Sequence, residues 1–191
     1  MAKKRSGRKS MSLSIFSILA LALVIITVPL LLVPFYNMQY SVGIGDWSGS
    51  GTLYTATGFD FLGGFFTKLF GGDIGLDNYA MLLAFSEETN VAAMLTGAFV
   101  LVLLIAAALY LIFFLLGVCG VIKKAKNLLN GMLILGVVAM IAATVCCFVI
   151  AGHYSGEISI SILSGTANGW TFAFIPLITL IGSAVLNGIK K

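Results

Sequence analysis

The chain has 191 residues, of which 60% are hydrophobic and 9% are charged, and its net charge is +4. Soluble domains usually carry about 25% charged residues, so this composition excludes an ordinary soluble domain. The positive charge does not indicate nucleic-acid binding, because the basic residues do not gather on one folded module.

Four long uncharged stretches predict four membrane-spanning helices, since a helix needs about 20 apolar residues to cross a bilayer. The uncharged stretches are residues 10–45, 89–122, 127–156 and 158–189. Within them we expect spans at about 12–36, 89–122, 127–153 and 170–189. The predicted fold class is a mainly α membrane protein, in which residues 1–191 form a single four-helix transmembrane bundle. Outer loops 37–88 and 154–169 together build a small extracellular β-sheet.

Acidic and basic residues are expected on opposite sides of the membrane. All seven acidic residues lie in the two outer loops, and Lys68 is the one basic residue there. The positive-inside rule then predicts a multi-pass protein of the cell membrane with both termini in the cytoplasm. The basic residues on the inner side are Lys3, Lys4, Arg5, Arg8, Lys9, Lys123, Lys124, Lys126, Lys190 and Lys191.

The first span is expected to be retained in the mature protein. Its apolar run from Leu13 to Phe35 is longer than the roughly 7–15 residues of a signal-peptide core. Pro29 lies within this run and predicts a kink near Ile25–Pro29, because proline cannot donate a helix hydrogen bond.

The first outer loop begins with an expected hairpin. Tyr40, Val42 and Ile44 alternate with small residues, and a second strand-prone segment covers Thr52–Gly58. The turn between them places Trp47 near the hairpin tip. The two outer loops are expected to share one sheet.

A short amphipathic helix is expected next. Its apolar face is predicted to lie on the outer leaflet or to cover the hairpin. Gly63, Gly64, Thr67 and Lys68 fall on the opposite face. The residues of the predicted apolar face are Leu62, Phe65, Phe66, Leu69 and Phe70.

Residues 71–78 form a glycine- and acid-rich turn. The spacing of its acids does not match the order of a calcium-binding EF-hand loop, so we expect a turn that leads into a capped segment through Phe85. Ser86 and the two glutamates after it are expected to start the second span, because acidic residues are favourable at a helix N-terminus.

The second outer loop contains one clear strand pattern. Ile158, Ile160 and Ile162 alternate with serines, and this strand is expected to pair with the hairpin of the first loop. Asn168-Gly169 is expected to turn the chain into the fourth span, with Trp170 at the membrane interface.

The sequence offers no candidate catalytic, cofactor or metal site. No ionisable residue lies at mid-membrane depth, where transport pathways usually place one. His153 has Glu157 as its expected nearest carboxylate, and we interpret it as an interfacial residue beside Tyr154. The three cysteines are expected to be apolar filler within the spans. They are Cys119, Cys146 and Cys147.

The order of the expected elements resembles that of the claudin and peripheral myelin protein superfamily of four-span proteins. Both have a long β-bearing first outer loop with a helix before the second span, a tight basic inner loop and a short second outer loop. Trp47 is the only tryptophan of the first loop, and Gly51-Thr52-Leu53-Tyr54 is faintly similar to the family's G-L-W motif. The family's two loop cysteines have no counterpart. The resemblance implies lateral self-association or an auxiliary role beside a larger membrane protein.

The expected function is non-enzymatic contact through the external module. The expected partners are the lipid bilayer and either another copy of the chain or another membrane protein, and not nucleic acid. An oligomeric channel or small-solute exporter subunit is the alternative, and a membrane-stress or envelope component without a single partner is a third. The residues expected to bind a partner are Trp47, Tyr54, Phe59, Phe61, Phe65 and Phe66.

Overall fold

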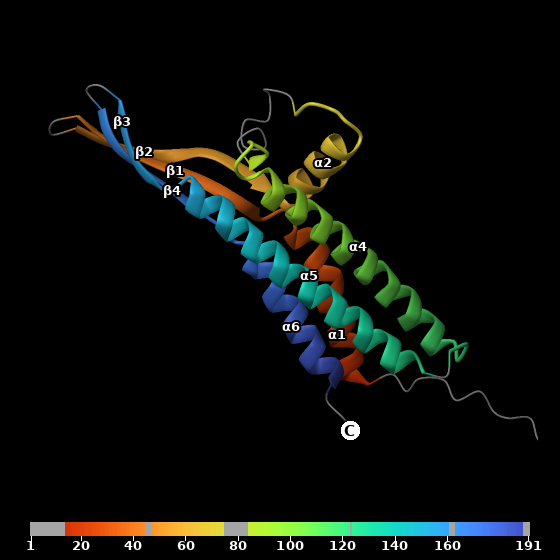
Figure 1. Ribbon diagram of the computed structural model, residues 1–191. Helices are drawn as coiled ribbons and strands as arrows, with labels where there is room; N and C mark the ends of the chain where they lie inside the picture. The colour runs from red at the N-terminus through yellow and green to blue at the C-terminus, as the bar shows by residue number, and fades with distance from the viewer. Residues whose placement is uncertain (1–13, 45–46, 75–83, 123, 161–162, 189–191) are drawn as a thin grey trace, which may run out of the picture.

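The computed structural model describes residues 14–44, 47–74, 84–122, 124–160 and 163–188. Its helices lie side by side in a bundle, and its strands form a sheet that projects from one end (Figure 1). We call this the sheet end. The elements in chain order are α1 (Ile15–Leu30), β1 (Pro34–Ile44), β2 (Trp47–Thr57), α2 (Gly58–Leu69), α4 (Asn90–Val118), α5 (Ala125–His153), β3 (Gly156–Ile160), β4 (Leu163–Trp170) and α6 (Phe174–Gly188).

Two helices of the described chain are long and apolar enough to cross a membrane. These are α4 and α5, each of 29 residues, which corresponds to about 43 Å of helix. α1 and α6 are apolar but shorter, with 16 and 15 residues. The prediction of a mainly helical protein with a small sheet is therefore confirmed at this level.

The first helix is shorter than the span expected at 12–36. The Ser14 hydroxyl accepts a hydrogen bond from the Ser17 N–H at the start of α1, and the helix ends at Leu30, directly after Pro29. Residues 34–36, which we expected at the outer end of the helix, instead begin β1. Both prolines favour this end, because Pro29 lacks an N–H and Pro34 disfavours helical backbone at the preceding residue.

A glycine ends α4 before the expected boundary at residue 122. Gly120 has φ +70°, a left-handed backbone that glycine adopts without strain. Its N–H donates to the Gly117 carbonyl, and the Val121 N–H donates to the Leu116 carbonyl. This is the Schellman pairing that closes many helices, and α5 begins shortly after it at Ala125.

The described strands form one antiparallel sheet in the order β2-β1-β4-β3. β1 and β2 pair from Pro34 with Thr57 to Ile44 with Trp47, which confirms the expected hairpin and the place of Trp47 beside its turn. Strands from both outer loops share this sheet, as expected, because β1 also pairs with β4.

The second loop contributes two strands where one was expected. The isoleucine-rich strand is β3, but it pairs with β4 and not with the first hairpin. β4 makes the contact with β1, from Trp170 opposite Asn37 to Ser164 opposite Gly43. Asn168-Gly169 is therefore part of a strand and not the predicted turn, and α6 starts at Phe174 and not at 170.

Polar side chains hold α1 and α6 together within the bundle. The hydroxyls of Thr27 and Thr179 lie 2.8 Å apart, and the Ser183 hydroxyl donates to the Ala20 carbonyl at 2.9 Å. Near the other end of the bundle, the Asn187 side chain donates to Asn130 on α5. The outer faces of all four bundle helices carry exposed large apolar side chains, such as Ile15, Leu115, Val138 and Ile178. The bundle is therefore polar between some helices and apolar on its surface.

Candidate functional site at the sheet end

The structure separates the six aromatic residues that the sequence predicts as partner-binding. Trp47 is the first residue of β2, and Tyr54 lies opposite Met38 further along the same strand. The side chains of both lie outside the described part of the structure. The other four are on α2, where Phe59 and Phe65 are partly buried and Phe66 is 36% exposed. Phe61 is fully buried, in contrast to its expected exposure.

α2 begins with a capping box that fixes its start at the end of β2. The Thr57 backbone N–H donates to the Asp60 carboxylate at 2.8 Å, and the Asp60 N–H donates to the Thr57 hydroxyl at 3.2 Å. Two of the free N–H groups at the helix start are satisfied in this way. Gly58 N–H also donates to the Leu31 carbonyl at 2.8 Å, which ties α2 to the end of α1.

The face of α2 that contacts the bundle is not the predicted apolar face. Its buried residues are Gly58, Phe61 and Gly64, although we placed Gly64 on the face opposite the apolar one. The predicted face is the more exposed one, since Leu69 and Phe70 are 56% and 81% exposed. The reason is close packing, because small residues let two helices approach further than bulky ones do.

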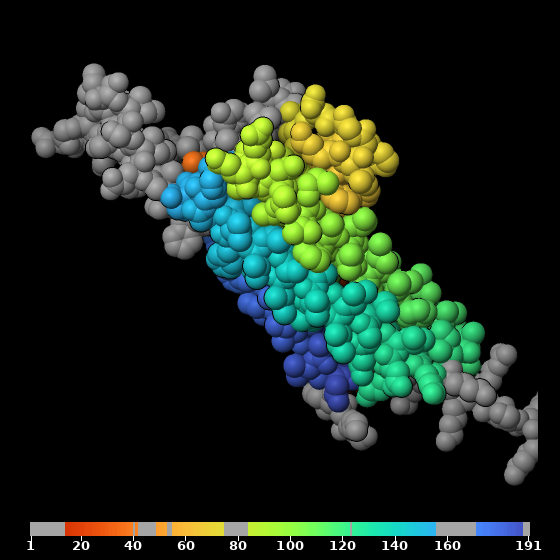
Figure 2. All heavy atoms as spheres, viewed as in Figure 1, coloured from red at the N-terminus to blue at the C-terminus, as the bar shows by residue number. Residues whose placement is uncertain are grey.

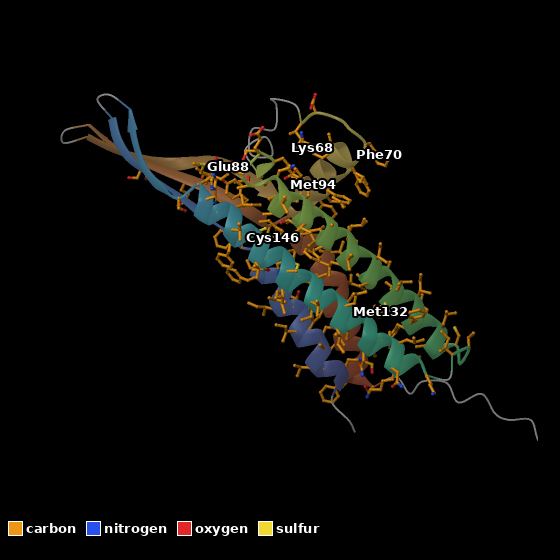
Figure 3. The ribbon with its side chains drawn as sticks, in the orientation of Figure 1. Lys68, Phe70, Glu88, Met94, Met132 and Cys146 are labelled. Carbon is orange, nitrogen blue, oxygen red and sulfur yellow. The ribbon has the colours of Figure 1, made fainter. Side chains whose placement is uncertain are left out.

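Gly97 of α4 is where this approach is closest. A Cβ atom at Gly97 would overlap the Phe61 carbonyl oxygen and the Phe65 Cβ. Phe61 also packs its ring against Phe85, with ring centres 6.3 Å apart. α2 is thus held firmly on the flank of α4, and Figure 3 shows Phe70 extending from it on the side away from the bundle.

A polar cluster joins the start of α4 to the end of α5 near β1. The Ser86 and Tyr154 hydroxyls lie 2.7 Å apart, and Ser86 also lies 3.1 Å from the Thr89 hydroxyl. The Tyr154 ring lies between Tyr36 of β1 and His153, with ring centres 6.3 Å and 4.9 Å away. We call Ser86, Glu88, His153, Tyr154 and Tyr36 the junction cluster.

The His153 imidazole faces Glu88, a partner that the sequence did not indicate, whereas the side chain of the expected partner Glu157 lies outside the described part of the structure. Its Nε2 lies 2.6 Å from a Glu88 carboxylate oxygen. The two side chains are 39% and 71% exposed, so water screens this pair and its contribution to stability is small. Glu88 is labelled in Figure 3 at the start of α4.

Buried phenols and amides complete the junction. The Tyr36 hydroxyl and the Asn37 and Asn90 side-chain oxygens are buried without a hydrogen-bond partner among the described residues. Burial, and to a lesser extent the neighbouring Tyr154, raises the pKa of Tyr36 well above its usual value. Tyr36 is therefore neutral at physiological pH. The polar contacts of the cluster form a clamp between the start of α4 and the end of α5, and the ring contact of Tyr36 with Tyr154 links this clamp to β1.

Removing one hydroxyl of this clamp should destabilise the protein. We expect Ser86→Ala or Tyr154→Phe each to lower the free energy of unfolding by about 1 kcal/mol, because each breaks a partly buried hydrogen bond. The double variant should lose clearly less free energy of unfolding than the two single variants lose together. Denaturant unfolding in detergent measures all three, and full additivity would show that the two hydroxyls do not interact.

Within the described ranges, no group of three or more histidine, cysteine or acidic side chains is placed to hold a metal ion. Comparison of the chain with models of protein families, with characterised proteins and with solved structures finds no match.

Proposed function

We propose that the protein is a non-enzymatic four-span membrane protein that associates laterally with other copies through its extracellular sheet. In this proposal α1, α4, α5 and α6 are the spans, and both termini lie in the cytoplasm. The observation that carries the proposal is a long, uncharged edge strand at the rim of a sheet that projects from an apolar bundle.

The surface of the bundle supports a location in the bilayer. Large apolar side chains cover the outer faces, whereas soluble proteins rarely expose contiguous apolar patches beyond a few hundred Å². The buried Thr27 and Ser183 bond to neighbouring helices or to backbone, as polar groups in hydrocarbon require. The helices with this apolar surface run along the length of the molecule in Figure 2.

The shorter helices α1 and α6 support the count of four spans. They lie against each other and are tied by the hydroxyl contacts of Thr27 and Ser183. At about 24 Å and 22 Å they are shorter than the roughly 30 Å hydrocarbon core. The apolar sequence continues beyond α1 through residues 31–33 and before α6 through residues 171–173, which supplies the remaining length.

Charge supports the orientation. Lys124 and Lys126 lie at the end of the bundle opposite the sheet, whereas Asp60, Glu87 and Glu88 lie at the sheet end. The positive-inside rule assigns the lysine end to the cytoplasm and the sheet to the outside.

The β2 edge supports the mode of association. β2 pairs only with β1 among the described strands, so its other edge has no strand beside it. Charged residues and prolines usually protect an exposed strand edge from pairing with another chain, and the 11 residues of β2 include neither. Leu53 is an extra residue between Thr52 and Tyr54 in the pairing with β1, which leaves residues 47–52 as the uninterrupted template for a second copy.

The same layout supports the proposed relationship to the claudin and peripheral myelin protein superfamily. A helix packed beside the second span and a sheet that joins both outer loops fit such an architecture. In an auxiliary role beside a larger membrane protein, the β2 edge would contact that protein and not a second copy of this chain.

Crosslinking at the β2 edge tests the proposal. We expect Ser50→Cys and Thr52→Cys, both exposed positions in a variant lacking the native cysteines, to give covalent dimers on intact cells with a short, membrane-impermeant bis-maleimide. Gln39→Cys is the matched control, because this exposed residue lies on β1 between two paired strands. Lys126→Cys should react only after permeabilisation. A protein that stays monomeric in mild detergent and forms no crosslinked species at either β2 position would contradict the proposal.

A further inference from the structure

The outward face of α2 is apolar but belongs to neither hydrophobic core. Successive residues of a helix are 100° apart, so Leu69 and Thr67 point about 160° away from each other. Leu69, Phe66 and Phe70 form an exposed apolar strip on this helix, and the rings of Phe66 and Phe70 stack with centres 6.3 Å apart. We call these three residues the α2 strip. Thr67 lies on the polar side with its hydroxyl bonded to the Gly63 carbonyl.

The contact with α4 fixes the depth of the strip. α2 meets α4 at Gly97, about 10 Å along the helix from its first residue, Asn90. α4 is about 43 Å long and exceeds the roughly 30 Å hydrocarbon core, so several ångströms project at its ends. In the bilayer proposed above, α2 therefore lies at the boundary between headgroups and acyl chains.

At this depth, the position of α2 outside the bundle exposes the α2 strip to lipid. α2 lies on the flank of α4, outside the bundle (Figure 2). α4 also carries exposed apolar residues near its start, including Val91 and Leu95, which are 70% and 43% exposed. Exposed apolar residues are therefore found on both α2 and the first turns of α4.

The same helix carries a positive charge on a different side from the strip. Lys68 points about 160° away from both Phe66 and Phe70, is the one described lysine or arginine at the sheet end, and makes no ion pair with a described carboxylate. Long basic side chains extend from apolar surroundings to bring their charge to the membrane interface. A phospholipid offers both the acyl boundary that suits the phenylalanines and the phosphate that suits the ammonium group.

We propose that α2 is an interfacial anchor whose strip of Phe66, Leu69 and Phe70 inserts among phospholipids of the outer leaflet, with Lys68 at the phosphates. The inference rests on the proposed membrane location but not on self-association. The anchor fixes the depth at which the sheet stands above the bilayer, because α2 follows β2 directly and is capped by Thr57.

Spin-label accessibility tests the anchor. In a cysteine-free protein in phosphatidylcholine nanodiscs, Leu69→Cys and its matched control Thr67→Cys are each labelled with a nitroxide. We expect the ratio of oxygen accessibility to nickel-chelate accessibility to be several-fold higher at position 69, because oxygen concentrates in lipid and the chelate stays in water. Equal ratios at the two positions, with both labels in water, would overturn the anchor.

A third label separates this inference from the proposed membrane location. Val138 is 57% exposed near the middle of α5, so Val138→Cys reports on the bilayer independently of α2. A lipid signal at 138 with a water signal at 69 would overturn the anchor alone. A water signal at 138 would overturn the membrane location and the anchor with it.

Discussion

Replacing Gly97 with leucine is expected to force α2 away from α4. Even a Cβ at this position overlaps the Phe61 carbonyl oxygen, and backbone cannot move aside as a flexible side chain can. Overpacking of a tight contact typically costs about 1–3 kcal/mol, and we expect the upper end of that range here. Thermal unfolding of the purified protein in mild detergent measures the loss as a fall in Tm.

Gly131 provides the matched control for Gly97. It also lies within a long bundle helix, but an added Cβ there meets no atom within 4 Å. Gly131→Leu should leave stability unchanged or raise it by up to about 1 kcal/mol, because glycine is a poor helix former. Equal effects of the two substitutions would show that α2 does not pack on Gly97.

Replacing Phe61 with alanine is expected to be the most destabilising single truncation in α2. Phe61 is fully buried in the core cluster at the sheet end and packs against Phe85. Truncation of a buried phenylalanine typically costs about 3–5 kcal/mol, from lost apolar contacts and the cavity that remains. Chemical unfolding in detergent measures the change.

Phe70→Ala is the matched control, because it also removes a phenylalanine side chain, but at the exposed C-terminal end of α2. Phe70 is 81% exposed, so its loss should change the free energy of unfolding in detergent by less than about 0.5 kcal/mol. A large effect at position 70, or a small one at 61, would contradict the assignment of the buried face of α2.

The parts of the fold that follow from apolar length and periodicity were predictable from sequence. The α4 and α5 helices, the first hairpin and the helix after it all appear close to the expected positions. Helix ends were less accurate, because they depend on local backbone such as the left-handed Gly120 and the two prolines around the end of α1.

The contact of α2 with α4 could not be predicted, because the hydrophobic pattern left the apolar face either on the outer leaflet or over the hairpin. In the structure, the contact is set by Gly64 and Gly97, whose small size permits close backbone approach. Ala93 and Gly97 are small residues four apart on α4, a spacing that suits close helix contacts. Nothing in the sequence indicated that the contacting helix would be α2.

The β4 strand and the His153–Glu88 pair were missed for related reasons. β4 consists mainly of small and polar residues without an alternating apolar pattern, so only its pairing with β1 and β3 defines it. Glu88 is 65 positions from His153 in the chain and is brought near it by the antiparallel packing of α4 and α5. A search for a partner close in sequence therefore found Glu157.

The pairing of α1 with α6 has a consequence for biosynthesis. Thr27 and its neighbour Thr179 are 152 residues apart, so at about 5–20 residues per second the ribosome needs roughly 8–30 s to supply the second after the first. During that interval the Thr27 hydroxyl can donate to the Leu23 carbonyl of its own helix, 2.8 Å away. In the proposed membrane location, α1 can thus enter lipid with the Thr27 hydroxyl satisfied before α6 is synthesised and packs against it.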